Sequence, residues 1–173
     1  IVFEGARASE SFSVFVHKAQ EGIIKFTHDD INEIPRHYYS IPEPIKYETG
    51  KNQIAHAFYY APNNPRYEGP ECELPPLLVM SHGGPTGATN TSLNLQIQFW
   101  TSRGFAVIDV NYRGSTGYGT EYRRMLNNNW GIVDVEDCIG GAQFLINKGI
   151  VDEKRIGIRG GSAGGYTTLA SLV

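Results

Sequence analysis

The first part of the chain alternates apolar and polar residues. Apolar side chains occupy every second position over residues 12–16, the pattern breaks at residues 20–22, and it resumes over residues 24–26. Alternation with such a break is typical of two strands joined by a tight turn, because successive side chains of a strand point to opposite faces. The pattern predicts a β-hairpin over residues 11–28. Its expected apolar face consists of Phe12, Val14, Val16, Ile24 and Phe26.

Prolines then interrupt the chain. Three of them fall within residues 31–50, which end in a turn-like stretch and predict a linker with a domain boundary near Ser40. Residues 54–60 predict a further strand. The Pro-, Gly- and Asn-rich residues 63–76 predict an irregular surface loop.

Short, continuous apolar runs follow at residues 77–81, 105–110 and 155–159. Runs of this length fit strands that are buried on both faces of a parallel sheet. Between them, apolar residues recur at helical spacing and stop at Gly104 and Gly149. Alternating strands and helices predict an α/β fold with an open, mostly parallel sheet. The expected buried stripes are Leu93, Ile97 and Trp100 in one helix and Val135, Ile139, Ala142 and Ile146 in the other.

Composition argues against several classes of function. The chain carries 15 Lys and Arg against 18 Asp and Glu, a net charge of -3, and 40% of its residues are hydrophobic. Since no basic run is visible, we expect neither nucleic acid nor a membrane surface as a partner. No stretch approaches the roughly 18 apolar residues of a membrane helix, and the first ten residues lack the features of a signal peptide.

The two cysteines do not suggest a disulfide framework. Cys72 falls in the Pro-rich loop and Cys138 in a helical pattern, where it is expected to be a small core residue. So few cysteines suit a reducing compartment, and the sequence predicts a cytoplasmic protein. Spacing alone leaves a single disulfide open.

The stretch Gly160-Gly161-Ser162-Ala163-Gly164 matches G-x-S-x-G, directly after a predicted strand and before a helix-compatible segment. This is the context of a nucleophile elbow, in which a strained turn holds a serine hydroxyl clear of the backbone. The helix N-terminus adds free N–H groups that favour a developing oxyanion. The alternative is a glycine-rich turn with an incidental serine, of the kind that binds phosphate in dinucleotide folds, but neither G-x-G-x-x-G nor a Walker lysine is present.

A second glycine cluster, residues 81–87, follows the first apolar run. In sheet hydrolases the loop at this place supplies half of the oxyanion hole. We expect the N–H groups of Gly84 and Ala163 to be the two donors. His82 is expected to shape this loop. Its alternative role as the catalytic base conflicts with the usual chain order of serine, acid and histidine.

Four motifs occur in one order: "HGGPTG", "NYRGSTGYG", "WGIVDVEDC" and "RGGSAGGYT". Together they resemble the catalytic domain of the prolyl oligopeptidase family of serine peptidases, in particular its acylaminoacyl-peptidase and dipeptidyl-peptidase-like branch. The resemblance covers Ile41 to the end of the chain. It implies an α/β-hydrolase fold, truncated after the elbow, over residues 41–173, and the end of a β-propeller with a linker over residues 1–40.

The resemblance also implies roles for individual residues. Ser162 is expected to be the nucleophile, with Gly84 and Ala163 as oxyanion donors. We expect Arg113 to brace a loop through a carboxylate, the alternative being an ordinary surface salt bridge. Further residues expected to support the site are His82, Gly83, Gly160 and Gly164, and the acidic group Asp134, Glu136 and Asp137.

Two aromatic residues stay open: Tyr118 and Trp130 are either core residues or pocket walls. The family implies short peptides as substrates and no metal or organic cofactor. A homo-oligomer is one of the outcomes that the sequence leaves open. The rival functions are a carboxylesterase with the same elbow, since one fold serves many chemistries, and a non-catalytic interaction module.

The chain departs from the family in one respect, because the family's triad Asp and His follow the nucleophile. The five histidines here, His17, His28, His37, His56 and His82, all precede Ser162. A serine without a general base is a poor nucleophile at neutral pH. We therefore expect these residues to be a fragment of a peptidase that is inactive alone. The elbow strand is also expected to lie at a sheet edge that promotes association.

Overall fold

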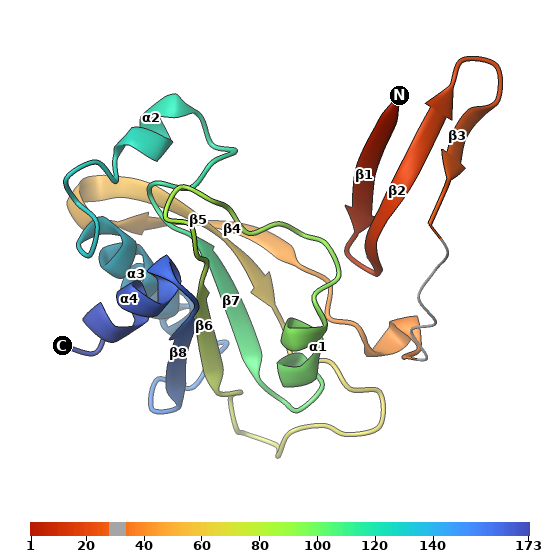
Figure 1. The fold of residues 1–173 in the computed structure, drawn as a ribbon. Coiled ribbons are helices and arrows are strands. Elements are labelled where there is room, and N and C mark those ends of the chain that lie inside the picture. Colours follow the sequence, from red (N-terminus) through yellow and green to blue (C-terminus); the bar gives the residue numbers. More distant parts are fainter. Residues whose placement is uncertain (28–33) are drawn as a thin grey trace.

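The computed structural model describes residues 1–27 and 34–173, and within them the strands form two sheets (Figure 1). Residue 28, the last of the predicted hairpin, and residues 31–33 of the predicted linker lie outside the described residues. The smaller sheet has three strands and the larger has five. The larger sheet carries the candidate site.

The small sheet consists of β1 (Val2–Arg7), β2 (Glu10–Lys18) and β3 (Gly22–Lys25), each antiparallel to its neighbour. The turn between β2 and β3 confirms the predicted hairpin, and β1 is an addition that the pattern did not predict. The register places Val16 opposite Ile24, which confirms that the predicted apolar residues share one side, but Phe12 on that side is 57% exposed while Ser13 on the other is buried. Alternation assigns residues to faces but does not reveal which face its neighbours cover.

The large sheet has the order β4-β5-β7-β6-β8 (Figure 1). Its strands are β4 (Glu43–Thr49), β5 (Gln53–Tyr60), β6 (Leu77–Ser81), β7 (Ala106–Asn111) and β8 (Ile156–Gly160). β6 runs parallel to β7 and β8, whereas β4 and β5 are antiparallel additions. The fold is therefore mixed α/β with a partly parallel sheet, and β8 lies at its edge.

Strand β4 corrects the prediction that residues 31–50 form a linker. Ile45 and Tyr47 are buried and alternate with the exposed Lys46 and Glu48. These alternating positions are too few, beside two prolines, to stand out as a strand in the sequence. β4 forms because it pairs along its length with β5.

The described helices lie on both faces of the large sheet. They are α1 (Leu95–Thr101), α2 (Thr120–Arg124), α3 (Val133–Asn147) and α4 (Ala163–Ala170), with 3-10 turns η1 (Arg36–Tyr38) and η2 (Gly50–Asn52). On β7, Ile108 and Val110 join the core beneath α3, whereas Val107 packs with Ile97 of α1. Since neighbouring strand residues point to opposite faces, the sheet separates two cores.

Helix α3 ends close to Gly149 as predicted, but its buried stripe differs. Ala142 is buried, whereas Ile139 is 53% exposed and Val135 is only partly buried. The buried side consists of Val133, Asp134, Asp137, Cys138, Gly141, Ala142 and Leu145. The carboxylates of Asp134 and Asp137 point inward because they accept hydrogen bonds from buried donors. A pattern based on hydrophobicity alone cannot predict such polar contacts. Cys138 is a buried core residue as predicted, and Cys72 is exposed.

Arg113, in the loop after β7, is fixed against α3. Its Nη2 lies 2.8 Å from Oδ1 of Asp137 and 2.7 Å from Oε2 of Glu136, and its backbone N–H donates to Oδ2 of Asp137 at 2.6 Å. Arg113 is 3% exposed and Asp137 is fully buried. The predicted brace through a carboxylate is confirmed, and the alternative of a surface salt bridge was wrong.

This buried pair predicts a large effect of removing one partner. We expect Arg113→Met to lower the free energy of unfolding by about 3–5 kcal/mol, because Asp137 would keep its burial without its cation. The matched control is Arg155→Met, which breaks the exposed pair with Asp152 and should shift the urea midpoint little. Equal midpoint shifts for the two variants would contradict the assignment.

Candidate active site

Ser162 lies between the end of β8 and the start of α4. Its backbone has φ 55° and ψ -121°, a conformation that costs free energy in any residue other than glycine. The side chain is exposed, and the hydroxyl precedes the N-terminus of α4. The geometry is that of the predicted nucleophile elbow.

The glycines around Ser162 are required by close approach. A Cβ on Gly160 would overlap the carbonyl of Gly164, and a Cβ on Gly164 would overlap the carbonyl of Ser81 at the end of β6. The Ser81 hydroxyl donates to the Gly164 carbonyl oxygen at 2.9 Å. The elbow is thus packed directly onto the neighbouring parallel strand, as sequence reasoning expected for Gly160 and Gly164.

The loop after β6 touches the elbow. A Cβ on Gly83 would lie 3.0 Å from the carbonyl oxygen of Gly161 and 3.3 Å from Cβ of Ser162. Gly84 follows at φ 58°, in the left-handed region. Within residues 1–27 and 34–173, neither the Gly84 N–H nor the Ala163 N–H donates to a protein acceptor. One free donor therefore lies in the residue after the serine and another in the loop that touches the elbow, an arrangement compatible with an oxyanion hole.

His82 is engaged at both ring nitrogens. Nε2 lies 2.8 Å from the Ser115 hydroxyl and Nδ1 lies 3.0 Å from the carbonyl oxygen of Gly83, while the ring stacks on Tyr112 at 4.3 Å. Burial lowers the pKa of His82 and favours the neutral ring. These contacts support the predicted loop-shaping role, because a general base for Ser162 needs a free nitrogen.

Thr89 clamps the same loop to β7, a feature that sequence reasoning missed. Its N–H donates to Oδ1 of Asn111 at 2.8 Å, its carbonyl accepts from Nδ2 of Asn111 at 3.1 Å, and its hydroxyl donates to Asp109. The available signal was two polar residues inside an apolar run. Both side chains point to one face of β7 and hold the loop that carries Gly84.

The two aromatic residues that were left open have different neighbours. Tyr118 is half-buried, stacks on His56 at 4.2 Å, and its hydroxyl accepts from Asn111 at 3.1 Å. Trp130 is 49% exposed and lies 5.0 Å from the ring of Tyr166 on α4. Tyr118 therefore supports the loop clamp, and Trp130 is not a core residue.

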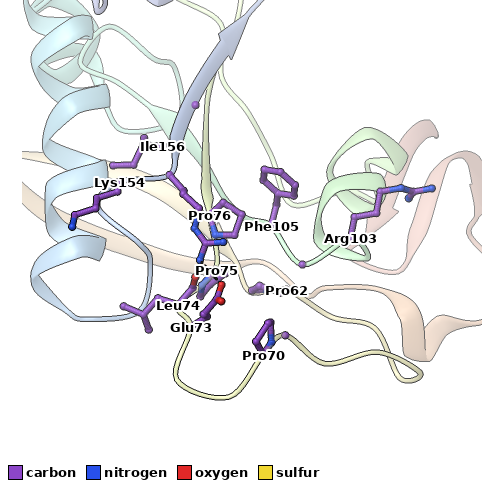
Figure 2. Close-up of a pocket in the computed structure, with 14 residues that line it drawn as sticks. Pro62, Pro70, Glu73, Leu74, Pro75, Pro76, Arg103, Phe105, Lys154 and Ile156 are labelled. Carbon is purple, nitrogen blue, oxygen red and sulfur yellow. Dashed lines mark hydrogen bonds and ion pairs between the residues drawn. The ribbon is translucent and has the colours of Figure 1, made fainter.

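Two cavities lie at opposite ends of the parallel strands. A polar cavity of about 400 Å³ borders the elbow and is lined by His82, Asp109, Arg159, Gly160 and Gly161 among others. A larger cavity of about 940 Å³ lies where β6, β7 and β8 begin, and Figure 2 shows its proline-rich wall and the Arg103 side chain pointing away from it. Only the first cavity adjoins Ser162.

Residues 1–27 and 34–173 contain no group of three or more His, Cys, Asp and Glu side chains placed to hold a metal ion. They also contain no helix with the length and hydropathy needed to cross a membrane.

A strained serine between a parallel strand and a helix, next to free backbone donors, is the arrangement of a nucleophile-elbow site on an α/β sheet. A model of the prolyl oligopeptidase family matches residues 91–173. The chain belongs to the prolyl oligopeptidase family, and its homologues there are serine peptidases.

The relatives agree with this family and are much longer. Over 56% of its own length, the chain is 36% identical to dipeptidyl aminopeptidase BIII of Pseudoxanthomonas mexicana. Over 70% of its own length, it is 36% identical to the acylamino-acid-releasing enzyme of Arabidopsis thaliana. A puromycin-hydrolyzing peptidase of Mycobacterium tuberculosis superposes on 99% of it with a TM-score of 0.95 and 44% identity. The chain spans 14% and 15% of the first two proteins and 26% of the third.

Asp109 predicts a pH dependence of stability. Burial raises its pKa from 3.8 to about 6, although the hydrogen bond from Thr89 opposes the shift. Since the fold prefers the protonated form, this contribution is fully present below pH 3.8 and is lost as the pH rises through 6. The loss at pH 7.5 is about 3 kcal/mol.

We therefore expect Asp109→Asn to raise the free energy of unfolding at pH 7.5 and to have little effect at pH 3.5. Urea midpoints of the variant and the unaltered protein at both pH values measure the difference, so that other titrating groups cancel. A stability difference that does not change with pH would show that Asp109 is not the titrating group.

Proposed function

We propose that the protein is a serine peptidase that hydrolyses short or N-terminally blocked peptides by acyl transfer through Ser162. The observation that carries the proposal is the backbone of Ser162, which presents an exposed hydroxyl beside two free N–H groups. A strained conformation of this kind persists where the surrounding structure enforces it, and such strain gathers at functional sites.

The relatives narrow the substrate class. Two of them carry names that refer to dipeptidyl and acylamino-acid release, and the solved structure at 44% identity is of a puromycin-hydrolyzing peptidase. A second puromycin hydrolase is 39% identical over 99% of this chain. We infer that the substrates are small amides with an aminoacyl or acylaminoacyl group on the carbonyl side, and puromycin is the first one to assay.

In the proposed reaction, the Ser162 hydroxyl attacks the carbonyl carbon of the substrate amide, and its proton passes to a general base. The N–H groups of Gly84 and Ala163 donate to the oxyanion that forms. The tetrahedral intermediate expels the amine, which takes a proton from the base, and water then hydrolyses the acyl-enzyme. His82 is engaged elsewhere, so the proposal places the triad Asp and His outside these 173 residues.

The proposal also assigns the two parts of the chain to domains. Residues 41–173 are the N-terminal part of an α/β-hydrolase catalytic domain, since the glycine loop follows the third strand of the large sheet and the elbow follows the fifth. Residues 1–40 are the end of a β-propeller, which the three antiparallel strands support. No cofactor is required by this chemistry, and the cytoplasmic location stays a prediction.

The nucleophile can be tested directly. We expect a fluorophosphonate probe to label the full-length protein and Ser162→Ala to abolish both labelling and puromycin hydrolysis, because the probe reacts with an activated serine. Ser171→Ala, at the residue that follows the end of α4, is the matched control and should keep both. Labelling that survives Ser162→Ala would exclude Ser162 as the nucleophile.

The oxyanion loop can be tested at Gly84. We expect Gly84→Val to lower kcat about 10²- to 10³-fold with a smaller change in KM, because a β-branched residue moves the donor away from the transition-state charge. Gly104→Val is the control, since Gly104 also has a positive φ and open space but lies at the far end of the strands. Equal losses in the two variants would remove Gly84 from the site.

A further inference from the structure

Asp134 is a buried carboxylate in the first turn of α3 that contacts the elbow helix. Its Oδ2 accepts from the hydroxyl of Thr167 on α4 at 2.5 Å, and its Oδ1 accepts from the backbone N–H of Gly131 at 2.7 Å. Both Asp134 and Thr167 have no exposed surface. A charge-assisted hydrogen bond of this length, shielded from water, is among the stronger polar contacts in a protein.

Thr167 lies one turn after Ala163, the residue that offers the second oxyanion donor. The Thr167 hydroxyl is 3.2 Å from the carbonyl oxygen of Ala163 and donates its single hydrogen to the closer, charged acceptor. The side chain of Thr167 is therefore held between the first turn of α4 and the start of α3. Movement of Asp134 would therefore move the first turn of α4.

Neighbours of Asp134 hold the adjacent residue of α4. Trp130 lies against the ring of Tyr166 at 5.0 Å, and a Cβ on Gly131 would lie 2.8 Å from the same ring. The turn before α3 and the first turn of α3 therefore contact two consecutive residues of α4: Trp130 and Gly131 contact Tyr166, and Asp134 accepts a hydrogen bond from Thr167. Together these contacts fix α4 against rotation about its axis.

Asp134 and Asp137 lie one helical turn apart on the buried side of α3 and serve different elements. Asp137 binds Arg113 in the loop after β7, whereas Asp134 has two hydrogen-bond donors and no ion pair within residues 1–27 and 34–173. Burying a carboxylate without a cation is costly. Apolar packing would join two helices more cheaply, so this arrangement favours a role in orientation.

We propose that Asp134 is a positioning residue of the active site, which acts through Thr167 to fix the first turn of α4 and so the aim of Ser162 and of the Ala163 N–H. The inference rests on the proposed function of Ser162. A strained φ at Ser162 tends to relax unless the surrounding structure opposes it, and the Asp134–Thr167 bond supplies that opposition from the helix side.

The test compares four variants and one control variant of the full-length protein with puromycin as substrate. Asp134→Asn can accept only one of the two donors through its single carbonyl oxygen, and Thr167→Val removes the hydroxyl at nearly constant volume. Each should lower kcat by about 10- to 100-fold with KM within about threefold, because a small misplacement of reacting groups costs this much. Thr167→Ser keeps the hydroxyl and should stay within about threefold of the unaltered kcat.

The double variant Asp134→Asn/Thr167→Val should lose no more activity than the less active single variant, because the two substitutions break the same hydrogen bond. Gln143→Ala, on the exposed side of α3, is the control. All assays run well below the melting temperature of each variant. Melting temperatures that fall while kcat is unchanged, or a kcat for Thr167→Val equal to that of Thr167→Ser, would overturn the proposal.

Failure of the two proposals can be told apart. If Ser162→Ala retains activity, the proposed function fails. If Ser162→Ala is inactive and Asp134→Asn keeps the unaltered kcat, only the positioning role fails. The rate of labelling by the fluorophosphonate probe gives a second measurement, because it depends on the aim of Ser162 and not on release of product. We expect that rate to fall in parallel with kcat.

Discussion

The backbone conformation of Ser162 is the constraint on which the site depends. A φ of 55° costs free energy in a residue with a side chain. The surrounding structure must therefore prevent Ser162 from relaxing to a backbone conformation of lower free energy. The close approach of Gly160 and Gly164 to β6 satisfies that requirement from the sheet side, because any larger residue there would push strand and helix apart. The parallel pairing of β6 with β8 places Gly160 opposite Ser81, which fixes the position of Ser162 along the sheet edge.

The loops at the same ends of the strands are held by buried polar side chains. Asn111 binds both backbone groups of Thr89, and Asp137 binds the backbone and the side chain of Arg113. Loops are ordinarily mobile because their backbone groups face water. Here rigid elements, β7 and α3, supply the partners, so that the loops of the candidate site are held as precisely as a strand and a helix.

Much of the sheet and the elbow could be predicted from the sequence, because apolar runs and paired glycines record local requirements. The strand at residues 53–60 and the turn at Ser162 are examples. Strand β4 and the buried side of α3 could not be predicted in the same way. They depend on partners distant in the chain: β4 on β5, and Asp137 on Arg113. A pattern that scores carboxylates as exposed places Ile139 inside and Asp137 outside, the reverse of the structure.

The electrostatic surroundings distinguish the cavity at the elbow from the larger proline-lined cavity. The large proline-lined cavity lies where the parallel strands begin, away from the N-terminus of α4, whereas the cavity at the elbow adjoins it. Burial lowers the pKa of His82 and favours its neutral ring, so the positive potential at the elbow comes from the N–H groups of the glycine loop and of the first turn of α4, together with Arg159 in the same cavity. Such dipoles are fixed before the substrate arrives and need no reorganisation when an oxyanion forms. The polar side chains of β7 and α3 keep those dipoles in place, which links the buried polar contacts of the fold to its proposed reaction.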